Sequence, residues 1–593
     1  MDNQRNLILA VVLTGLLLFG WDAGVKYFYP HANKPVASAS ASAPAAADPA
    51  APRPANASKP TREGGLTSAS DIALEAKDLT TALNPAGRVP VAAPGLSGSI
   101  NLTGAVLDDL TANRHTATVE KDSGPARIFS PAGTPAQQFA QFGWVGTGAT
   151  LPTATTVWAV PAGAKLTPQM PVTLSWTSPT GQAFTIRYAI DRDYLITATQ
   201  SVTNSSAAPV TVKPFALINR TDKTASVDTW NVHSGPLGAF DSAVSFGPNY
   251  KDVVETGLVA NTGKTDWIGF TDIYWLSALI PDEAPTTSDY RALGGGTYRA
   301  DLVYQDTAVA PGQTLTRTTR LFAGAKESTV LDRYEAAGIP KFGLAIDWGW
   351  FRWFEKPIFL LLKWLFGAVG NFGVAIILLT FVVRGLMFPI AQRQFASMAA
   401  MRAIQPKMKA LQERYKDDKQ KQQQEVMALY KAEGVNPLAG CLPIFLQIPV
   451  FFALYKVLIV SIEMRHQPFA LWIRDLSAPD PLHILNLFGM LPFTPPSFLG
   501  IGILAVLLGI TMWMQFKLNP AQMDPMQQQV FAIMPWMMMF VMAPFAAGLL
   551  LYWITSNILT IAQQKYLYSK HPALKAQVDK DTTDAKRAES RAK

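Results

Sequence analysis

Cysteine is almost absent from this chain of 593 residues, which contains a single one, Cys441. One cysteine cannot form an intrachain disulfide, so the sequence excludes a secreted scaffold held together by disulfides. Cys441 stands at the start of an apolar run, where a small, weakly polar residue at a helix entrance is the favoured interpretation. The six histidines lack the spacing of metal ligands. The sequence therefore predicts no metal site and no cofactor.

Long apolar runs are absent between residues 61 and 340. A helix needs about 20 apolar residues to cross a bilayer, so this region is expected to lie outside the membrane. Short segments of alternating polarity recur in it between turn residues, which is typical of half-buried strands. The clearest segments are residues 171–178, 184–190, 194–202, 209–218, 297–304 and 314–322. We predict an antiparallel β-sandwich over residues 61–340.

Paired catalytic groups are also missing from the predicted sandwich. Sugar conversion needs an acid and a base, usually a histidine with a carboxylate. His115 and His233 are the histidines available, and neither stands in a recognisable motif. A structural or partner-docking role is therefore favoured over a carbohydrate-binding or carbohydrate-converting one, and no enzyme is predicted.

The N-terminal residues begin like a signal peptide or a signal anchor. Arg5 precedes a nearly unbroken apolar run, residues 7–21. Charged and aromatic residues at 22–29 separate this run from the small residues that could supply a cleavage site, so an uncleaved anchor is favoured. Residues 31–60 are almost entirely Ala, Pro and Ser, with too little apolar bulk to fold, and are predicted to be a linker.

The C-terminal region carries the apolar runs that the central region lacks. We predict five spans there, which together with the anchor make six, and the positive-inside rule then places both termini in the cytoplasm. The predicted organisation is anchor 1–30, linker 31–60, periplasmic sandwich 61–340, interfacial amphipathic helix 341–370, second span 371–391, cytoplasmic helical hairpin 392–436, four further spans 437–568 with a break at 543–548, and basic cytoplasmic tail 569–593.

Arg384 is the unexpected residue of this region, since it lies inside the apolar run 371–389. A helical rise of about 1.5 Å per residue places it roughly 20 Å from the start of the run. An arginine at such depth costs about 2.5–17 kcal/mol. The predicted spans contain no Asp or Glu that could neutralise it. Two interpretations stay open, an arginine that snorkels to the cytoplasmic headgroups or one that lines a water-filled cavity.

A few other polar residues lie within the predicted spans. Thr380 is four residues before Arg384, on the same helix face, and Gln447, Gln515, Ser556 and Asn557 lie in later spans. A solute or proton transporter is the alternative function. It would need paired discontinuous helices, internal repeats or a relay acid, and the sequence shows none of these.

Several long strings resemble the Oxa-type family of bacterial membrane-protein insertases, in its Gram-negative form. They are residues 379–389 (LTFVVRGLMFP), 427–455, 468–481 (PFALWIRDLSAPDP), 523–529 and 548–564. The resemblance covers nearly the whole chain. It implies a mutarotase-like periplasmic sandwich and a helical membrane core that encloses a hydrophilic groove, and hence an insertase and folding chaperone for inner-membrane proteins.

The resemblance also implies the site residues. Arg384 and Thr380 match the family's groove positions, and residues in matching segments are Gln447, Gln515, Tyr552, Trp553, Ser556 and Asn557. Trp553 departs from the pattern, because the family often has tyrosine there, and the stretch 483–498 looks longer than the usual loop. The implied partners are nascent membrane proteins, the Sec translocon, the ribosome and targeting machinery, and membrane lipids; no specific nucleic acid is expected.

Overall fold

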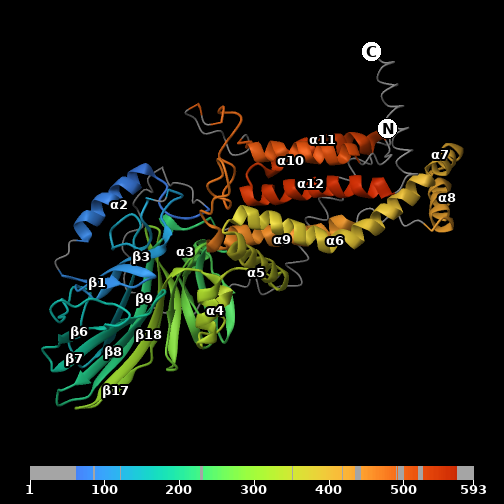
Figure 1. Cartoon of the computed structure of the whole chain (residues 1–593). Helices are drawn as coiled ribbons and strands as arrows, with labels where there is room; N and C mark the ends of the chain where they lie inside the picture. Colours follow the sequence, from blue (N-terminus) through green and yellow to red (C-terminus); the bar gives the residue numbers. More distant parts are fainter. Residues whose placement is uncertain are drawn as a thin grey trace.

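The computed structural model consists of a layered β-sheet region and a bundle of long helices that extends away from it (Figure 1). It describes residues 62–570 except for residues 84–86, 121, 228–231, 350, 417, 435–441, 489, 492–499 and 519–524. The predicted anchor, the linker, Cys441 and all but the first two residues of the predicted tail lie outside the described residues.

The strands form two antiparallel sheets. The 10-stranded sheet contains β1 (Arg88–Ala92), β2 (Leu96–Asn101), β3 (Val106–Thr116), β5 (Gln138–Thr147), β9 (Val210–Thr221), β16 (Thr297–Tyr304), β15 (Thr286–Gly294) and β12 (Leu258–Ala260) in that spatial order, with β4 (Pro125–Phe129) beside β3 and β17 (Thr307–Val309) beside β9. The 8-stranded sheet has the order β11 (Ala243–Phe246), β10 (Gly235–Phe240), β13 (Thr265–Thr271), β14 (Trp275–Ile280), β18 (Thr314–Ala325), β8 (Leu195–Asn204), β7 (Gln182–Ile190) and β6 (Val172–Thr177). The predicted sandwich is confirmed, and each of the six predicted segments lies in a strand.

Alternation along the strands separates the buried face from the water-facing one. In β8, Ile196, Ala198 and Val202 are buried, whereas Thr197, Thr199 and Ser201 are only half-buried. Successive side chains of a strand point to opposite faces, so this pattern directs the apolar side chains into the space between the sheets. On the outer face, the hydroxyl of Thr203 lies 2.8 Å from that of Thr314 on the neighbouring β18. The period-2 pattern therefore specifies which face is buried.

Buried polar groups tie the two sheets together. Gln200 of β8 donates from Nε2 to the carbonyl of Gly143 on β5, at 2.8 Å. Gln138 of β5 donates in the same way to the hydroxyl of Ser277 on β14, at 2.9 Å. A buried amide without a partner would be destabilising, so such bonds restrict the register in which the sheets can pack.

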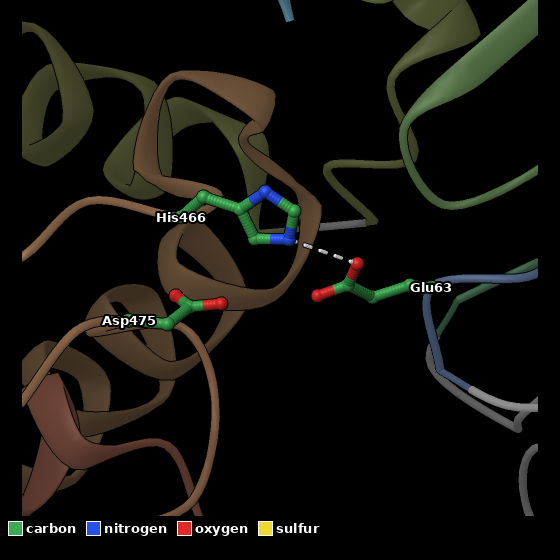
Figure 2. A group of neighbouring side chains, drawn as sticks. All are labelled: Glu63, His466 and Asp475. Carbon is green, nitrogen blue, oxygen red and sulfur yellow. Dashed lines mark hydrogen bonds and ion pairs between the residues drawn. The ribbon is translucent and has the colours of Figure 1, made fainter. Parts of the chain in front are cut away.

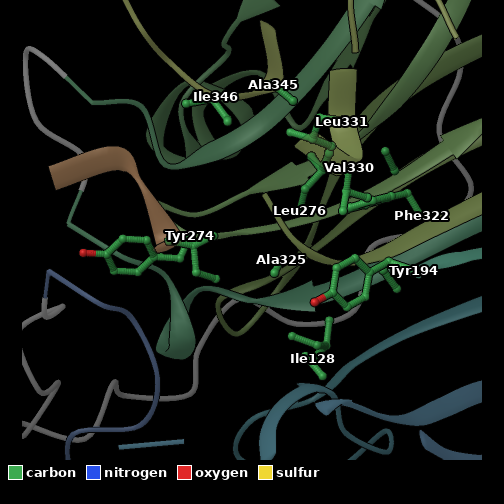
Figure 3. Packing of buried hydrophobic residues seen from close by; sticks show 14 of the residues in the cluster. Ile128, Tyr194, Tyr274, Leu276, Phe322, Ala325, Val330, Leu331, Ala345 and Ile346 are labelled. Atoms are coloured by element: carbon green, nitrogen blue, oxygen red, sulfur yellow. The ribbon is translucent and has the colours of Figure 1, made fainter. Parts of the chain in front are cut away.

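Short helices accompany the strands of the sandwich. They are α2 (Ala69–Ala82), α3 (Tyr250–Thr256), α4 (Ser328–Ala336) and the 3₁₀ turns η2 (Asp222–Thr224) and η3 (Phe342–Ala345). Figure 3 shows Val330 and Leu331 of α4 in the buried cluster that also holds Phe322 of β18. The ring of Phe322 stands edge-on to that of Phe342, at 5.2 Å. This packing fixes the segment that leads from the last strand to the helical region.

The helical region begins at α5 (Arg352–Val369). Its remaining helices are α6 (Phe372–Ala403), α7 (Gln405–Arg414), α8 (Lys419–Ala432), α9 (Leu442–Val460), α10 (Ile503–Leu518), α11 (Pro525–Met542) and α12 (Ala547–Lys570), with the 3₁₀ turn η5 (Ile462–Met464) after α9. The predicted break between the last two spans is present, since α11 ends at Met542 and α12 begins at Ala547. The candidate span within α6 is Phe372–Gln392, within one residue of the predicted 371–391, and the helix continues beyond it to Ala403. The interfacial helix, predicted from 341, starts at Arg352.

One described helix segment, Phe372–Gln392, is both long and apolar enough to cross a membrane. The other apolar helix segments are shorter: Phe445–Val460, Ile503–Lys517 and Ala532–Met542. Large apolar side chains are nevertheless exposed on these four helices and on α12. Examples are Leu386 of α6, Phe445 of α9, Leu507 of α10, Ile533 of α11 and Ile558 of α12. Exposed apolar surface of this extent is typical of helices that face lipid. The count of six spans stays a prediction.

Helix α5 has two contrasting faces. Phe359 and Leu362 are buried against the rest of the molecule, whereas Trp353 and Trp364 are 70% and 69% exposed. Tryptophan on the exposed face of an amphipathic helix is typical of a helix that lies along the membrane surface. Lys356 holds the helix to the sandwich through an ion pair with Asp332 at 2.9 Å.

Helices α7 and α8 form the predicted hairpin, with its turn after Arg414. Lys407 of α7 and Glu433, directly after α8, form an ion pair at 2.6 Å. The hydroxyl of Tyr430 lies 3.1 Å from the sulfur of Met408. These contacts join the open end of the hairpin, so the two helices are held side by side.

Candidate functional site

Arg384 lies half-buried on α6 and turns toward α12. Its Nε donates to the hydroxyl of Ser556 at 3.0 Å, and its Nη2 donates to the same oxygen. Ser556 is buried and uncharged. The helices α6, α9, α10, α11 and α12 contain no Asp or Glu at all. The described hydrogen bonds of Arg384 therefore leave its positive charge without a neutralising carboxylate.

A second hydrogen bond reaches the same face of α12. Gln447 of α9 donates from Nε2 to the hydroxyl of Tyr552, at 2.5 Å. Tyr552 and Ser556 are four residues apart, so they project from the same face of α12, one turn from each other. Arg384, Gln447, Tyr552 and Ser556 therefore form one polar cluster between α6, α9 and α12. We call these four residues the polar cluster.

Several glutamines of α9, α10 and α12 have a polar atom that is buried and has no hydrogen-bond partner among the described residues. They are Oε1 of Gln447, Oε1 of Gln515, Nε2 of Gln563 and Oε1 of Gln564. Buried polar atoms of proteins almost always have a partner, either a protein group or a water molecule. These helices therefore offer hydrogen-bonding capacity that the described part of the chain does not use.

The other predicted site residues occupy different surroundings. Thr380 is fully buried, and its hydroxyl donates to the carbonyl of Ile376 in its own helix, at 2.7 Å. Asn557 is buried and donates from Nδ2 to the hydroxyl of Thr511 on α10, at 3.2 Å. The ring of Trp553 stands edge-on to that of Phe451 at 5.1 Å. Neither Thr380 nor Asn557 has a described contact with Arg384.

Two features escaped the sequence interpretation. Thr511 bonds to Asn557, but a lone threonine within an apolar helix is not a distinctive signal. The second feature is a charged junction between the sandwich and the segment after α9, centred on Arg465, which is 7% exposed. Its guanidinium donates from Nη1 to the carbonyl of Thr116 at 2.9 Å and lies 5.5 Å from the ring of Trp275. No spacing rule links residues so far apart in the sequence.

Figure 2 shows one part of this junction, where Glu63, His466 and Asp475 face one another. Their ligand-type atoms all lie within 4.8 Å, the arrangement of a possible metal site. However, Glu63 Oε2 also accepts from Arg465 Nη2 at 3.1 Å, so a divalent cation would meet a fixed positive charge. Burial opposes ionisation of Glu63, but the bond from His466 and the charge of Arg465 hold its pKa below the ordinary value. We therefore assign the group to ion pairing.

Arg62 completes the junction from the N-terminal side. Its guanidinium donates to the carbonyls of Ser477 and Leu458, the latter at 3.0 Å, and to the hydroxyl of Tyr274 at 3.2 Å. Glu463 accepts from the backbone of Ser328 at 3.1 Å. Three parts of the chain, the residues before the first strand, the sandwich and the 461–480 loop, are thus joined at one place.

A buried carboxyl of α5 makes the stability of this region depend on pH. Glu355 is 5% exposed, and burial raises its pKa from 4.5 to about 7, although Lys456 nearby opposes this shift. The folded protein then keeps a proton that the unfolded chain releases, so stability should fall as pH rises from 4.5 to 7, by at most about 1.4 kcal/mol per pH unit. Glu355→Gln should remove this contribution. Thermal midpoints of both proteins at several pH values would measure it.

A parallel pH dependence in the two proteins would contradict the assignment to Glu355. Asp347 faces the same region and also raises the pKa of Glu355. Lys326 is fully buried, and burial lowers its pKa to about 8. Lys326 changes the stability of the protein only between about pH 8, its pKa in the folded protein, and pH 10.5, its ordinary pKa. This range lies above the range of pH 4.5 to 7 in which Glu355 acts.

Comparisons with known proteins match both parts of the chain. A family model described as the YidC periplasmic domain matches residues 88–361, and one described as 60Kd inner membrane protein matches residues 364–575. A protein of Zymomonas mobilis subsp. mobilis named membrane protein insertase YidC is 43% identical over 574 residues, which is 96% of each chain. A protein of Rhizobium etli with the same name is 41% identical over 582 residues, again 96% of each chain.

Solved structures show weaker similarity. The crystal structure of an active YidC insertase, with its first transmembrane domain resolved, covers 80% of this chain and 92% of its own, at 19% identity and a TM-score of 0.34. A galactose mutarotase related enzyme from Lactobacillus acidophilus covers 40% of this chain and 97% of its own, at 10% identity and a TM-score of 0.28. Both scores are too low to carry an argument, so the assignment relies on the sequence matches.

The sequence matches assign this chain, a sandwich joined to apolar helices that contain no Asp or Glu, to the membrane protein insertases that carry a periplasmic domain. Such a protein resides in the inner membrane. The chain belongs to the YidC family of membrane protein insertases.

Proposed function

We propose that this insertase receives the polar segment of an incoming membrane protein at Arg384 and releases the adjoining apolar segment into lipid. The observation that carries the proposal is that the charged guanidinium of Arg384 has the neutral hydroxyl of Ser556 as its described partner. A charge in apolar surroundings gains most from a partner that can supply negative charge or strong acceptors. An acidic or polar passenger segment offers both.

The unused amide groups support the same step. A polar segment that enters an apolar region loses its water, at a cost of several kcal/mol for each unpaired group. Gln447 and Gln515 present buried carbonyl oxygens that have no partner in the described part of the chain, so they could accept hydrogen bonds from the passenger or from accompanying water. The polar cluster would thus replace part of the hydration that the segment gives up.

Lipid partition supplies the driving force for the apolar segment. Each Leu, Ile, Phe or Val near the bilayer centre contributes about 0.3–0.6 kcal/mol. Exposed side chains on the helices beside the polar cluster, such as Phe381 of α6 and Phe452 of α9, present an apolar surface that the segment could follow. Neither step requires covalent chemistry, a metal or a cofactor. Chaperone action would follow from the same surface, since it can hold an apolar segment before release.

The proposed topology follows from charge. The α7–α8 hairpin is rich in Lys and Arg, and basic residues also follow α12, so both are placed in the cytoplasm by the positive-inside rule. The sandwich is then periplasmic, and both termini are cytoplasmic. The proposed domain limits remain those of the sequence interpretation, and helix α6 runs on from the second span into the cytoplasmic region as far as Ala403.

The proposed partners are nascent membrane proteins, membrane lipids, the Sec translocon for some substrates, and the ribosome with its targeting machinery. The α7–α8 hairpin is the best-described candidate for the ribosome contact. It is held closed by Lys407 and Glu433, and it projects from the end of α6 opposite the sandwich (Figure 1). A hairpin with an excess of Lys and Arg over Asp and Glu suits a negatively charged partner.

Depletion of the protein in cells is the direct test. Insertion of single-span and double-span reporter proteins, followed by protease protection, should fall sharply, while transport of solutes should be unaffected in the first minutes. Unchanged insertion together with a loss of solute uptake would contradict the proposal. A variant that lacks most of residues 61–330 should retain substantial insertion, because the polar cluster lies outside the sandwich; loss of all insertion in a stably expressed variant would assign the activity to the sandwich.

A further inference from the structure

The segment between α9 and α10 exposes an unusual number of large apolar side chains. We call residues 482–488, 490 and 491 the apolar loop. Six of its side chains are at least two-fifths exposed, with Met490 at 79%: Ile484, Leu485, Leu487, Phe488, Met490 and Leu491. A stretch of this composition on a water-facing surface would be an aggregation hazard, so it is expected to be covered by another apolar phase.

Charge is missing from the loop and from its continuation. No Asp, Glu, Lys or Arg occurs between Asp480 and Lys517. Surfaces that recognise soluble proteins usually place a polar or charged rim around an apolar centre. This stretch has no charged residue for such a rim, whereas lipid chains require none. The composition therefore favours lipid over a soluble partner.

The apolar loop is fixed to the end of a helix that itself exposes apolar residues. Asp480, at the start of the loop, accepts from the backbone N–H of Leu504 in α10, at 2.8 Å. The N–H of Ile484 donates to the carbonyl of Ile501 at 3.0 Å. Both bonds hold the beginning of the apolar loop close to the N-terminal end of α10. Figure 1 shows the segment in orange beyond the ends of α10 and α11 that lie nearer the sandwich. In the proposed topology, this end of α10 faces the periplasmic side of the membrane.

The backbone of the loop is largely satisfied from within. Phe488 donates to the carbonyl of His483 at 2.9 Å, and Leu491 donates to that of Asn486 at 3.1 Å. Leu487 and Phe488 have φ angles of 49° and 60°, a left-handed conformation that bulky side chains rarely adopt. The internal bonds hold this turn, and they lower the cost of moving the backbone into the headgroup region. The turn leaves both side chains about half exposed.

We propose that the apolar loop inserts into the outer leaflet of the inner membrane and anchors the periplasmic ends of α9 and α10 there. Lipid is the partner, and the contacts are those of Leu485, Leu487, Phe488 and Met490 with the acyl chains next to the headgroups. The α5 helix, with its exposed tryptophans, would be a separate interfacial element. The inference concerns how the protein sits in the bilayer, so it does not depend on the passenger's route past Arg384.

Site-specific fluorescence tests the proposal in the full-length protein, reconstituted in vesicles of phosphatidylethanolamine and phosphatidylglycerol. In a Cys441→Ser background, an environment-sensitive fluorophore is attached at Met490→Cys or, as a control, at Met170→Cys. Met170 is 53% exposed on the sandwich and provides a matched methionine. Lipids with a nitroxide high on the acyl chain should quench the fluorophore at position 490 at least about two-fold more than the control, and aqueous iodide should show the reverse order.

Two results would overturn the proposal. Equal quenching by iodide at both positions would place the loop in water, and protection of position 490 from both quenchers would indicate a protein surface instead. Labelling with a membrane-impermeant maleimide in intact spheroplasts is an independent check that needs no reconstitution. Met490→Cys should react several-fold more slowly than Met170→Cys, and detergent should remove the difference; equal rates before detergent would contradict lipid insertion.

Discussion

Arg384→Ala is expected to lower the insertion of substrates that have polar or acidic translocated segments by about ten-fold or more. A hydrogen bond to a charged group contributes about 1.5–3 kcal/mol, and about 1.4 kcal/mol corresponds to a factor of ten. Arg384→Lys should retain much of the activity, because it keeps the positive charge and can still donate to Ser556. Protease protection of reporters, at matched protein levels, measures the effect. Substrates with short or weakly polar segments should be the least affected.

Ser556→Ala is the matched control for the charge. It removes the neutral acceptor of Arg384 but leaves the guanidinium, so insertion should change by a smaller factor than in Arg384→Ala. If the Arg384→Ala variant inserts every reporter as efficiently as the unaltered protein does, the charge of Arg384 does not contribute to insertion. If Arg384→Lys is as defective as Arg384→Ala, the geometry of the guanidinium matters more than its charge. Crosslinks from position 384 to a nascent chain would show direct contact.

Asp272→Ala should destabilise the sandwich by about 3–5 kcal/mol, the cost of leaving a buried charge without its partner. Asp272 accepts from Arg220 at 2.6 Å, and Arg220 is 1% exposed. The same carboxylate also accepts from the backbone of Ser226 at 2.9 Å and from the hydroxyl of Ser234 at 3.2 Å. One substitution thus removes three hydrogen bonds. Urea unfolding of the full-length protein in detergent, followed by near-ultraviolet circular dichroism, would report the loss.

An exposed ion pair of the same sandwich provides the control. Lys213 and Asp306 lie 2.7 Å apart, but both side chains are largely in water. Asp306→Ala should therefore cost no more than about 1 kcal/mol. An effect of Asp272→Ala as small as that of Asp306→Ala would show that water or a rearranged group compensates Arg220. Replacement of both members of the buried pair by apolar residues should recover part of the lost stability.

Periodicity predicted those strands that have one buried and one exposed face. β7 and β8 alternate almost perfectly, and the sequence located both. In contrast, every residue of β13 (Thr265–Thr271) is buried, including Asp266 and Gly269, because both faces of this central strand are covered. A strand without a polar face has no period-2 pattern. The sequence interpretation therefore found the clearest strands and missed most of the others.

The candidate site was predictable residue by residue but not as a set of contacts. Arg384 stood out because a charge in an apolar run is costly. Its partner Ser556 is far away in the sequence, and the pairing depends on how α6 packs against α12, which no local pattern encodes. Thr380 shares a face with Arg384, yet its hydroxyl bonds within its own helix. Residues such as Glu63 and Arg465, brought together across the whole chain, lie equally beyond the reach of sequence patterns.

The lack of carboxylates in the five long apolar helices has a consequence for the energy supply of the cell. Water near Arg384 would otherwise provide a path along which protons could leak through an energised membrane. Proton relays use Asp, Glu or His, and none of these residues occurs in α6, α9, α10, α11 or α12. A fixed guanidinium repels small cations as well, as arginine does in water-selective pores. If water enters beside Arg384 as proposed, these five helices offer it no chain of Asp, Glu or His side chains along which a proton could be relayed.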